Sequence, residues 1–344
     1  MGAILVVNAG STSLKLSLVA GDETTLSISS LGDVPTTGLE AVAHRVVHGG
    51  ARFTDPLVID DSVREAILEL EDLAPLHNAP ALRGIEEASS ALPEVPHVAV
   101  FDTAFHATIP PEASVYAIPR RWREERGIRR YGFHGLSVQW AAECVPVSRL
   151  VVCHLGGGCS VTAVRDGRSV DTTMGFTPLE GVPMSTRSGS VDPGAILYLL
   201  RDSEIDAGTL DHALNFDSGL NGLAGSGDMA EIDERVEEGD PDALLALGVF
   251  THRVAAAVAA MTVAAEGLDA LVFTAGIGEG SASTRARVCE RLGFLGVELD
   301  SEANRAAQPD VPVSTPGSLV RVWVIQARED LVAARAARDL LANP

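Results

Sequence analysis

The chain has 344 residues, of which 46% are hydrophobic and 21% are charged. This length suits two domains, and this composition excludes a disordered chain. The net charge of −21 argues against nucleic acid and anionic membranes as partners. The longest nearly apolar stretch, 254–265, is too short to cross a bilayer and predicts a buried, alanine-rich helix. The first ten residues carry no basic segment, so no secretory signal is expected.

Cysteine and lysine are sparse. The four cysteines, at positions 144, 153, 159 and 289, form no CxxC pair. This pattern favours small core residues in the reducing cytoplasm. Lys15 is the single lysine among 26 basic residues, and it lies where a Gly/Ser turn meets a strand. Either lysine is required there in place of arginine, or it persists by chance.

The first elements of the chain predict a hairpin. The apolar run 3–7 and the alternating segment 14–18 predict two strands, joined by the Gly/Ser turn 8–13. A helix is expected over 62–73, with Ser62 as N-cap and Glu65 completing a capping box. Another helix is expected over 79–92, and the segment 97–105 predicts a buried strand that ends in Asp102.

The remaining elements repeat this order. A strand over 147–158 ends in three glycines, and a hairpin follows around Asp166-Gly167. The chain therefore holds two copies of one pattern, beginning near residues 3 and 150. Further elements are helices over 194–202 and 241–266, a strand with a glycine-rich turn over 269–280, a helix over 283–292, a strand over 320–325 and a helix over 329–341. This alternation predicts an α/β fold, with breaks between two lobes near 103–106 and 329–331.

Three glycine-rich turns each follow an apolar strand. They are NAGSTS (8–13), HLGGG (154–158) and GIGEG (276–280). Backbone N–H groups at such turns favour phosphate, and glycine lets a ligand approach closely. One such turn alone is ordinary, whereas three on separate strands indicate a phosphate-bearing ligand.

Charged residues accompany these turns. Arg45 and Arg187 lie next to small residues, where a guanidinium can bind a carboxylate or a phosphate through two hydrogen bonds. Asp102 and Glu329 follow predicted strands and are candidate Mg²⁺ ligands. Taken singly, each has an ordinary alternative: a surface arginine, a helix N-cap or, for His134, a structural histidine.

Taken together, these motifs resemble the acetate kinase family, which comprises acetate and propionate kinases of the actin-like ASKHA superfamily. The matching blocks include VVNAGSTSLKLSL (6–18), AHRVVHGG (43–50), YGFHGLS (131–137), HLGGGCSV (154–161), VDTTMGFTPLEGVPMSTRSGSVDPG (170–194) and VFTAGIGE (272–279). The resemblance implies two actin-like, ribonuclease H-like α/β lobes around a central cleft. Their expected bounds are 1–104 plus 331–344, and 105–330.

The resemblance also implies an activity. It is the reversible, Mg²⁺-dependent transfer of a phosphoryl group from ATP to acetate, giving acetyl phosphate and ADP. Propionate is the expected secondary substrate, and Mn²⁺ is an alternative ion. The implied partners are a small carboxylate and a nucleotide, with neither nucleic acid nor membrane, and the implied assembly is a cytoplasmic homodimer.

Residue roles follow from the same resemblance. The catalytic residues are Arg45, Asp102, His134 and Arg187. The acyl group is expected against Arg45, Val47, Leu76, Phe133 and Pro178, with His77 near the site. The nucleotide is expected against Ser11, Ser13, Lys15, His154, Leu155, Gly156, Gly157, Gly158, Asp228, Met229, Ala230, Gly276, Ile277, Gly278, Glu279 and Gly280. The metal ligands are Asn8 and Glu329.

The sequence departs from the family mainly at the nucleotide end. Gly157 and Gly280 stand where Asn is usual, Ala230 where Arg is usual, Ser190 where Asp is usual, and Ala327-Arg328 where Thr-Asn is usual. Three interpretations stay open. The chain is an ATP-dependent enzyme that has drifted, or a carboxylate kinase with another donor such as pyrophosphate or another nucleotide, or a weakly catalytic ligand-binding protein. The presence of every catalytic residue argues against the third.

Overall fold

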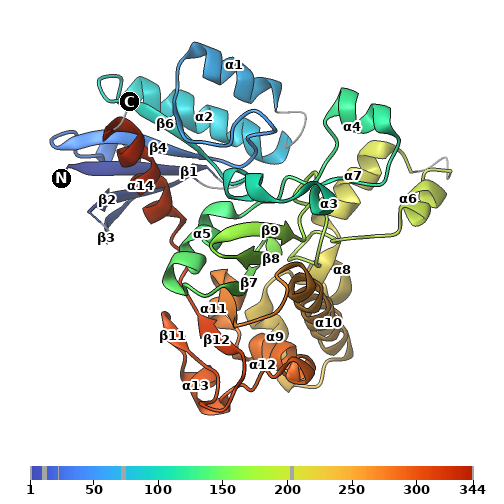
Figure 1. The fold of residues 1–344 in the computed structure, drawn as a ribbon. Helices are drawn as coiled ribbons and strands as arrows, with labels where there is room; N and C mark the ends of the chain where they lie inside the picture. Colours follow the sequence, from blue (N-terminus) through green and yellow to red (C-terminus); the bar gives the residue numbers. More distant parts are fainter. Residues whose placement is uncertain (1, 10–13, 22, 71–74, 202–204, 343–344) are drawn as a thin grey trace.

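The computed structural model describes residues 2–9, 14–21, 23–70, 75–201 and 205–342, and of 75–77 it describes the backbone only. Two six-stranded sheets organise these residues, one from each half of the chain (Figure 1). The predicted α/β class is confirmed.

The first sheet has the order β3-β2-β1-β4-β6-β5. Its strands are β1 (Ala3–Ala9), β2 (Leu14–Ala20), β3 (Glu23–Ile28), β4 (Leu39–Val46), β5 (Leu57–Val58) and β6 (His97–Phe101). Strands β1 and β2 pair antiparallel, as the predicted hairpin requires, and β4 and β6 continue the sheet in parallel. The short edge strand β5 runs antiparallel to β6.

The second sheet has the order β11-β12-β10-β7-β8-β9. Its strands are β7 (Arg149–Leu155), β8 (Cys159–Arg165), β9 (Arg168–Thr172), β10 (Ala270–Thr274), β11 (Val311–Pro312) and β12 (Arg321–Val324). An antiparallel triplet again leads into two parallel strands and an antiparallel edge. The two sheets thus have the same topology, which confirms the predicted repeat.

Helices α1 (Asp61–Glu69), α2 (Pro75–Ala91) and α14 (Glu329–Ala342) belong to the first half of the molecule. The prediction of Ser62 as N-cap is wrong. Asp60 caps α1 instead, because its carboxylate accepts the Val63 N–H at 2.8 Å. Although α14 comes from the end of the described chain, its apolar face packs on the first sheet against Ile4, Val6 and Ala43.

The longest helix, α10 (Pro241–Ala264), is apolar and long enough to span a membrane by length and composition alone. Its buried side chains, among them Leu247, Phe250 and Val258, lie in the same core cluster as residues of β7 and β8. It is therefore the core helix of the second half, as its sequence predicts. Helix α5 (Gly135–Cys144) lies between the halves and contacts α14 and β7 (Figure 1).

The remaining helices connect these parts. They are η1 (Leu31–Asp33), η3 (Ala104–Thr108), α3 (Pro111–Ser114), α4 (Arg120–Arg126), α6 (Pro193–Leu199), α7 (Ala207–Phe216), α8 (Gly219–Ala224), α9 (Met229–Glu237), α11 (Ala275–Gly280), α12 (Ala282–Arg291), η4 (Gly293–Leu295) and α13 (Ser301–Ala306). One prediction is wrong here. The segment GIGEG is helical, as α11, rather than an open glycine turn. Its first turn is held by Glu279, whose carboxylate accepts the Ala275 N–H at 2.9 Å.

Candidate active site

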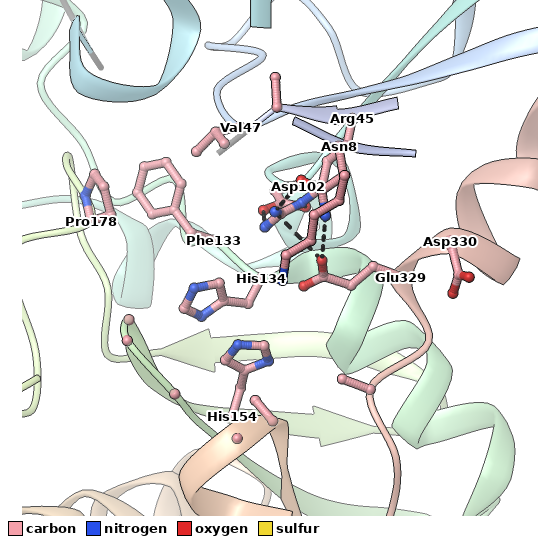
Figure 2. A pocket seen from close by; sticks show the side chains of 18 of the residues that line it. Asn8, Arg45, Val47, Asp102, Phe133, His134, His154, Pro178, Glu329 and Asp330 are labelled. Atoms are coloured by element: carbon pink, nitrogen blue, oxygen red, sulfur yellow. Dashed lines mark hydrogen bonds and ion pairs between the residues drawn. The ribbon is translucent and has the colours of Figure 1, made fainter. Parts of the chain in front are cut away.

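A cavity of about 620 Å³ lies at the ends of the parallel strands of both sheets. Asn8, Arg45 and Asp102 reach it from β1, β4 and the end of β6, and His154 reaches it from β7 (Figure 2). In α/β sheets, ligands bind at these carboxyl ends of strands. The cavity therefore occupies the position at which the fold places a binding site.

Arg45 is tied to three neighbours. It pairs in register with Asn8 of the adjacent parallel strand, so the two side chains share one face of the sheet. Its Nε donates to Asp102 Oδ1 at 2.9 Å, and a second guanidinium nitrogen donates to Asp102 Oδ2. The Asn8 side-chain oxygen accepts from Arg45 at 3.0 Å, and Glu329 lies 3.4 Å away. Arg45 therefore has a fixed orientation.

The charges of this cluster act on each other strongly. Burial by itself lowers the pKa of Arg45, but the charges of Asp102 and Glu329 outweigh it and raise the pKa. Burial raises the pKa of the Asp102 carboxyl, and the Arg45 guanidinium opposes this. The two hydrogen bonds make Arg45 and Asp102 a bidentate pair, the stronger type of charge-assisted contact.

His134 is placed by a strained segment of backbone. It adopts φ 61° immediately before α5, a conformation that a non-glycine residue rarely takes. The next residue, Gly135, donates its N–H to the Asp102 carbonyl at 3.0 Å. A Cβ at Gly135 would lie 2.0 Å from that oxygen, so only glycine fits. This contact brings Asp102 and His134 into one site.

Two imidazole rings stack in the cavity. The rings of His134 and His154 lie 4.0 Å apart between centroids and 20° apart in plane (Figure 2). Burial, His154 and the two arginines hold the pKa of His134 well below its usual range. Burial and Arg45 lower the pKa of His154 to about 4. Both rings are therefore neutral at pH 7.

Arg187 reaches the cavity from the second half of the molecule. It donates to the Pro178 carbonyl at 2.9 Å and lies 3.7 Å from the Met184 sulfur. No carboxylate pairs with it among the residues that the structure describes. Burial lowers its pKa from the ordinary arginine value. It stays charged, because an arginine pKa lies far above neutrality.

An apolar corner lies beside the arginines. Val47, Phe133 and Pro178 line the cavity and converge in Figure 2. His48 lies behind them, with its ring 5.3 Å from that of Phe133. Leu76 and His77 fall in α2 at positions whose side chains lie outside the description. The apolar character of this corner suits an alkyl group rather than a polar ligand.

Sequence comparison places this geometry in a known family. The family model of acetokinases matches residues 33–335. The chain is 48% identical to the acetate kinase of Nostoc punctiforme over 314 residues, which cover 89% of this chain and 77% of that protein. The chain belongs to the acetokinase family. It is a phosphotransferase that acts on a carboxyl group, of the acetate kinase type, as the sequence predicts.

Solved structures agree with this family. A propionate kinase from Francisella tularensis superposes with a TM-score of 0.90 at 35% identity, over 98% of this chain and 99% of that chain. The acetate kinase of Porphyromonas gingivalis superposes with a TM-score of 0.90 at 31% identity, over 99% of this chain and 100% of that chain. These relatives confirm the predicted two-lobed, actin-like fold.

The residues predicted to bind the nucleotide divide into two groups. Seven of them line the cavity: Lys15, His154, Gly156, Gly157, Gly158, Gly276 and Glu279. The others lie outside its described lining. Leu155 and Ile277 are buried in the core, Met229 is buried at the start of α9, and Asp228 caps that helix. Gly278 is buried, Ala230 and Gly280 are exposed, and Ser11 and Ser13 lie outside the described residues.

Two of the predicted departures from the acetokinase pattern, Gly157 and Gly280, leave open space rather than strain. A Cβ added at Gly157 or at Gly280 would meet no heavy atom within 4 Å. Both glycines are exposed, as is Ala230. The backbone at these positions could therefore carry the larger residues that the family has.

The metal prediction concerns Asn8 and Glu329. The Asn8 amide donates to Glu329 at 3.3 Å, while its oxygen accepts from Arg45. No group of three or more acidic, histidine or cysteine side chains forms a metal site among the described residues. Mg²⁺ usually needs only one or two carboxylates and keeps several waters. Glu329 is partly exposed to the cavity and fits such an ion, whereas Asn8 as a second ligand stays a prediction.

Sequence reasoning missed two serines of the site. Ser137 bonds to His154 Nδ1 at 2.8 Å, and Ser160 bonds to His134 Nδ1 at 3.1 Å. The predicted second copy of the strand–turn–strand pattern, with its glycine turn at 156–158, held a signal for one of them. Closing it around the glycines puts residue 160 opposite 154, as the observed strand register does. The other contact depends on the packing of α5, which no local pattern encodes.

Proposed function

We propose that this chain catalyses the reversible transfer of the γ-phosphoryl group of ATP to acetate, giving acetyl phosphate and ADP, with propionate as a slower substrate. The observation that carries this proposal is the meeting of Arg45, Arg187 and His134 beside the apolar corner of Val47, Phe133 and Pro178. A short carboxylate fits there with its alkyl group in the corner and its charge toward the arginines.

The reaction needs positioning and charge neutralisation more than covalent help. A carboxylate oxygen attacks the γ-phosphorus in line, and three equatorial oxygens then need donors. Arg187 offers a guanidinium with no paired carboxylate among the described residues, and His134 offers a neutral N–H. Arg45, held by Asp102, offers a fixed cation on the other side.

The donor end carries the phosphate and the metal. We assign the triphosphate to the backbone of Gly156–Gly158 and to Lys15, all of which line the cavity. Glu329 would hold Mg²⁺ through one carboxylate, and the ion would neutralise charge on the phosphates. Asn8 keeps Glu329 and Arg45 in place through its two hydrogen bonds.

Closure of two lobes would exclude water from this reaction. We propose lobes of 1–104 plus 331–344 and of 105–330, which hinge near 103–106 and 329–331. The cavity draws residues from both parts, and α14 begins at Glu329. Solution scattering with and without Mg·ADP and acetate tests this. Identical profiles would contradict closure.

We also propose a cytoplasmic homodimer. All four cysteines are free, in keeping with a reducing compartment. Apolar side chains on the second half of the molecule are exposed, including Leu197, Tyr198, Phe216 and Leu245. Such side chains are typical of surfaces that a partner covers. The mass measured by sedimentation tests this, and a monomer would contradict it.

Acyl phosphate formation tests the function directly. Purified protein is incubated with acetate and hydroxylamine, with Mg·ATP in one series and with Mg-pyrophosphate in a parallel series. Product with ATP supports the proposal and means that Gly157, Gly280 and Ala230 are tolerated changes. Product with pyrophosphate alone would mean that pyrophosphate, and not ATP, is the donor. No product in either series would reject the activity. Propionate and butyrate, compared by kcat/KM, then test the corner, since butyrate as best substrate would contradict it.

A further inference from the structure

Three histidines in and beside the site each have a serine hydroxyl on Nδ1. His106 bonds to Ser169 at 2.8 Å, His134 to Ser160 at 3.1 Å and His154 to Ser137 at 2.8 Å. All three serines are buried. A neutral imidazole has one N–H and one acceptor nitrogen, so each hydroxyl helps to decide which nitrogen holds the proton.

His106 shows the outcome where the geometry leaves no choice. Its Nε2 lies 2.9 Å from the Phe133 carbonyl oxygen, which can only accept. Nε2 therefore carries the proton, Nδ1 is the acceptor, and the Ser169 hydroxyl donates to it. The pKa of His106 is lowered by burial to about 4, so the ring is neutral and this tautomer is unique.

His134 has the same contact on Nδ1 but a different environment at Nε2. Among the described residues, the Ser160 hydroxyl is the one hydrogen-bond partner of the ring. Nε2 faces the cavity, where a Cβ added at Gly158 would lie 3.2 Å from it and 3.6 Å from an Arg187 nitrogen. Nε2 is thus the atom that can meet a ligand held by Arg187.

The placement of Ser160 follows from the sheet. Ser160 is the cross-strand partner of His154 in the β7–β8 pair. The His134 ring lies flat on that of His154, so its Nδ1 reaches the neighbouring hydroxyl. The hydroxyl is completely buried, and the strand holds its carbon atoms in place.

We propose that Ser160 is a positioning residue, which donates its hydroxyl proton to His134 Nδ1 and thereby keeps the imidazole proton on Nε2, aimed at the phosphoryl group in transfer. This rests on the proposed function, because a phosphoryl oxygen is an acceptor and needs a donor opposite it. Without the hydroxyl, the proton is free to occupy Nδ1, and Nε2 would then present a lone pair to an anion.

The first test leaves Ser160 unchanged. Nitrogen-15 spectra of the histidine rings in the free protein distinguish the two tautomers, and His134→Gln assigns the resonances. The proposal expects His134 to match His106, with the proton on Nε2. A proton on Nδ1 of His134 overturns it. This result is independent of activity, so it stands even if acyl phosphate formation fails.

The second test compares matched variants. Ser160→Ala is expected to lower kcat roughly 10- to 100-fold with KM values for acetate and ATP within about 3-fold, and to shift the His134 nitrogens toward a mixture of tautomers. Ser169→Ala removes an equally buried hydroxyl from a histidine outside the cavity lining, and kcat is expected to stay within about 3-fold of wild type. Equal kcat values for the two variants overturn the proposal. If Ser160→Ala fails to fold, the wild-type spectra decide.

Discussion

The two arginines of the cavity differ in what balances their charge. Arg45 is held by Asp102, Asn8 and Glu329, two of which are carboxylates. Arg187 contacts only a carbonyl oxygen and a sulfur atom among the described residues. One side of the cavity is therefore a neutralised, rigid cluster, and the other presents an uncompensated cation.

Because of this difference, we expect Arg45 and Arg187 to have different roles. A guanidinium with its charge already paired orients a ligand but gains little from a new anion. An unpaired, buried guanidinium gains strongly when a negative charge arrives, and it gains most where charge develops during the reaction. The asymmetry therefore predicts that rate depends on Arg187, and that stability depends on the partners of Arg45.

A fall in pH should have the largest effect of all, because it destabilises the folded protein through its buried histidines. Burial lowers the pKa values of His48, His106 and His154 to about 4, below the unfolded value of about 6.5. The unfolded chain thus binds protons first as pH falls, so this stability is complete above pH 6.5 and is lost between pH 6.5 and 4. We expect about 2 kcal/mol per histidine, or roughly 6 kcal/mol in total, to be lost by pH 5. Urea titrations at pH 7.5, 6 and 5 measure it, and equal midpoints would contradict it.

Removal of the unpaired cation should have the next largest effect. Arg187→Ala is expected to lower kcat for acyl phosphate formation by about 10³-fold, because one donor to the developing charge is lost. Arg187→Lys keeps the charge without the planar fork and should recover part of the rate. Steady-state kinetics at saturating acetate and Mg·ATP measure both. A decrease confined to KM would show that Arg187 binds the ground state only.

On the Arg45 side of the cavity, loss of a charge partner should lower the stability of the protein. Asp102→Asn leaves Arg45 without its buried carboxylate, and the free energy of unfolding should fall by about 3 kcal/mol. Asp269→Asn is the matched control, because it breaks an arginine pair that is largely exposed, worth less than about 1 kcal/mol. Urea denaturation measures both variants. Equal losses would mean that burial adds nothing to the Arg45 pair.

The apolar corner spans both sides and should set acyl length. Val47→Ala widens it, and the ratio of kcat/KM for butyrate to that for acetate should rise about 10-fold. Val58→Ala, at an exposed position on the edge strand β5, serves as control and should leave the ratio unchanged. A ratio that does not move in Val47→Ala would place the alkyl group elsewhere.

The smallest effect is expected at the donor end. Gly280→Asn restores a side chain where the structure leaves open space, and the KM for Mg·ATP should fall about 3-fold, as for one added hydrogen bond. The KM for acetate should stay the same. Gly293→Asn, at another open glycine outside the cavity lining, should change neither. A higher KM for ATP in Gly280→Asn would mean that the glycine suits the donor.

Much of the fold was readable from local patterns. The alternation after Leu14 and around Asp166-Gly167 predicted both hairpins, and the repeat of the two sheets followed. Where the prediction was wrong, two local signals competed. Asp60 and Ser62 both suit an N-cap, and GIGEG carries enough glycine to suggest a turn, although Glu279 stabilises it as a helix.

The site was less readable, because its contacts are distant in sequence. Asn8 and Glu329 are separated by 321 positions and share a hydrogen bond. No periodicity predicts that contact, and the family resemblance alone suggested it. The His134–Ser160 contact depends on how α5 is oriented against the second sheet. The left-handed backbone at His134 has no sequence signal beyond the glycine that follows it.

The position of α14 has a consequence for synthesis. This helix covers one face of the first sheet, whose strands lie within the first 101 residues. During synthesis, that face therefore stays uncovered until most of the chain has been translated. Until then, Ile4, Val6 and Ala43 lack their cover and invite contacts with other nascent chains or a chaperone. Because Glu329 opens the same helix, the late docking of this helix also completes the cluster of Arg45, Asn8 and Glu329 in the cavity. Activity therefore emerges only in chains that have been translated to the end of this helix.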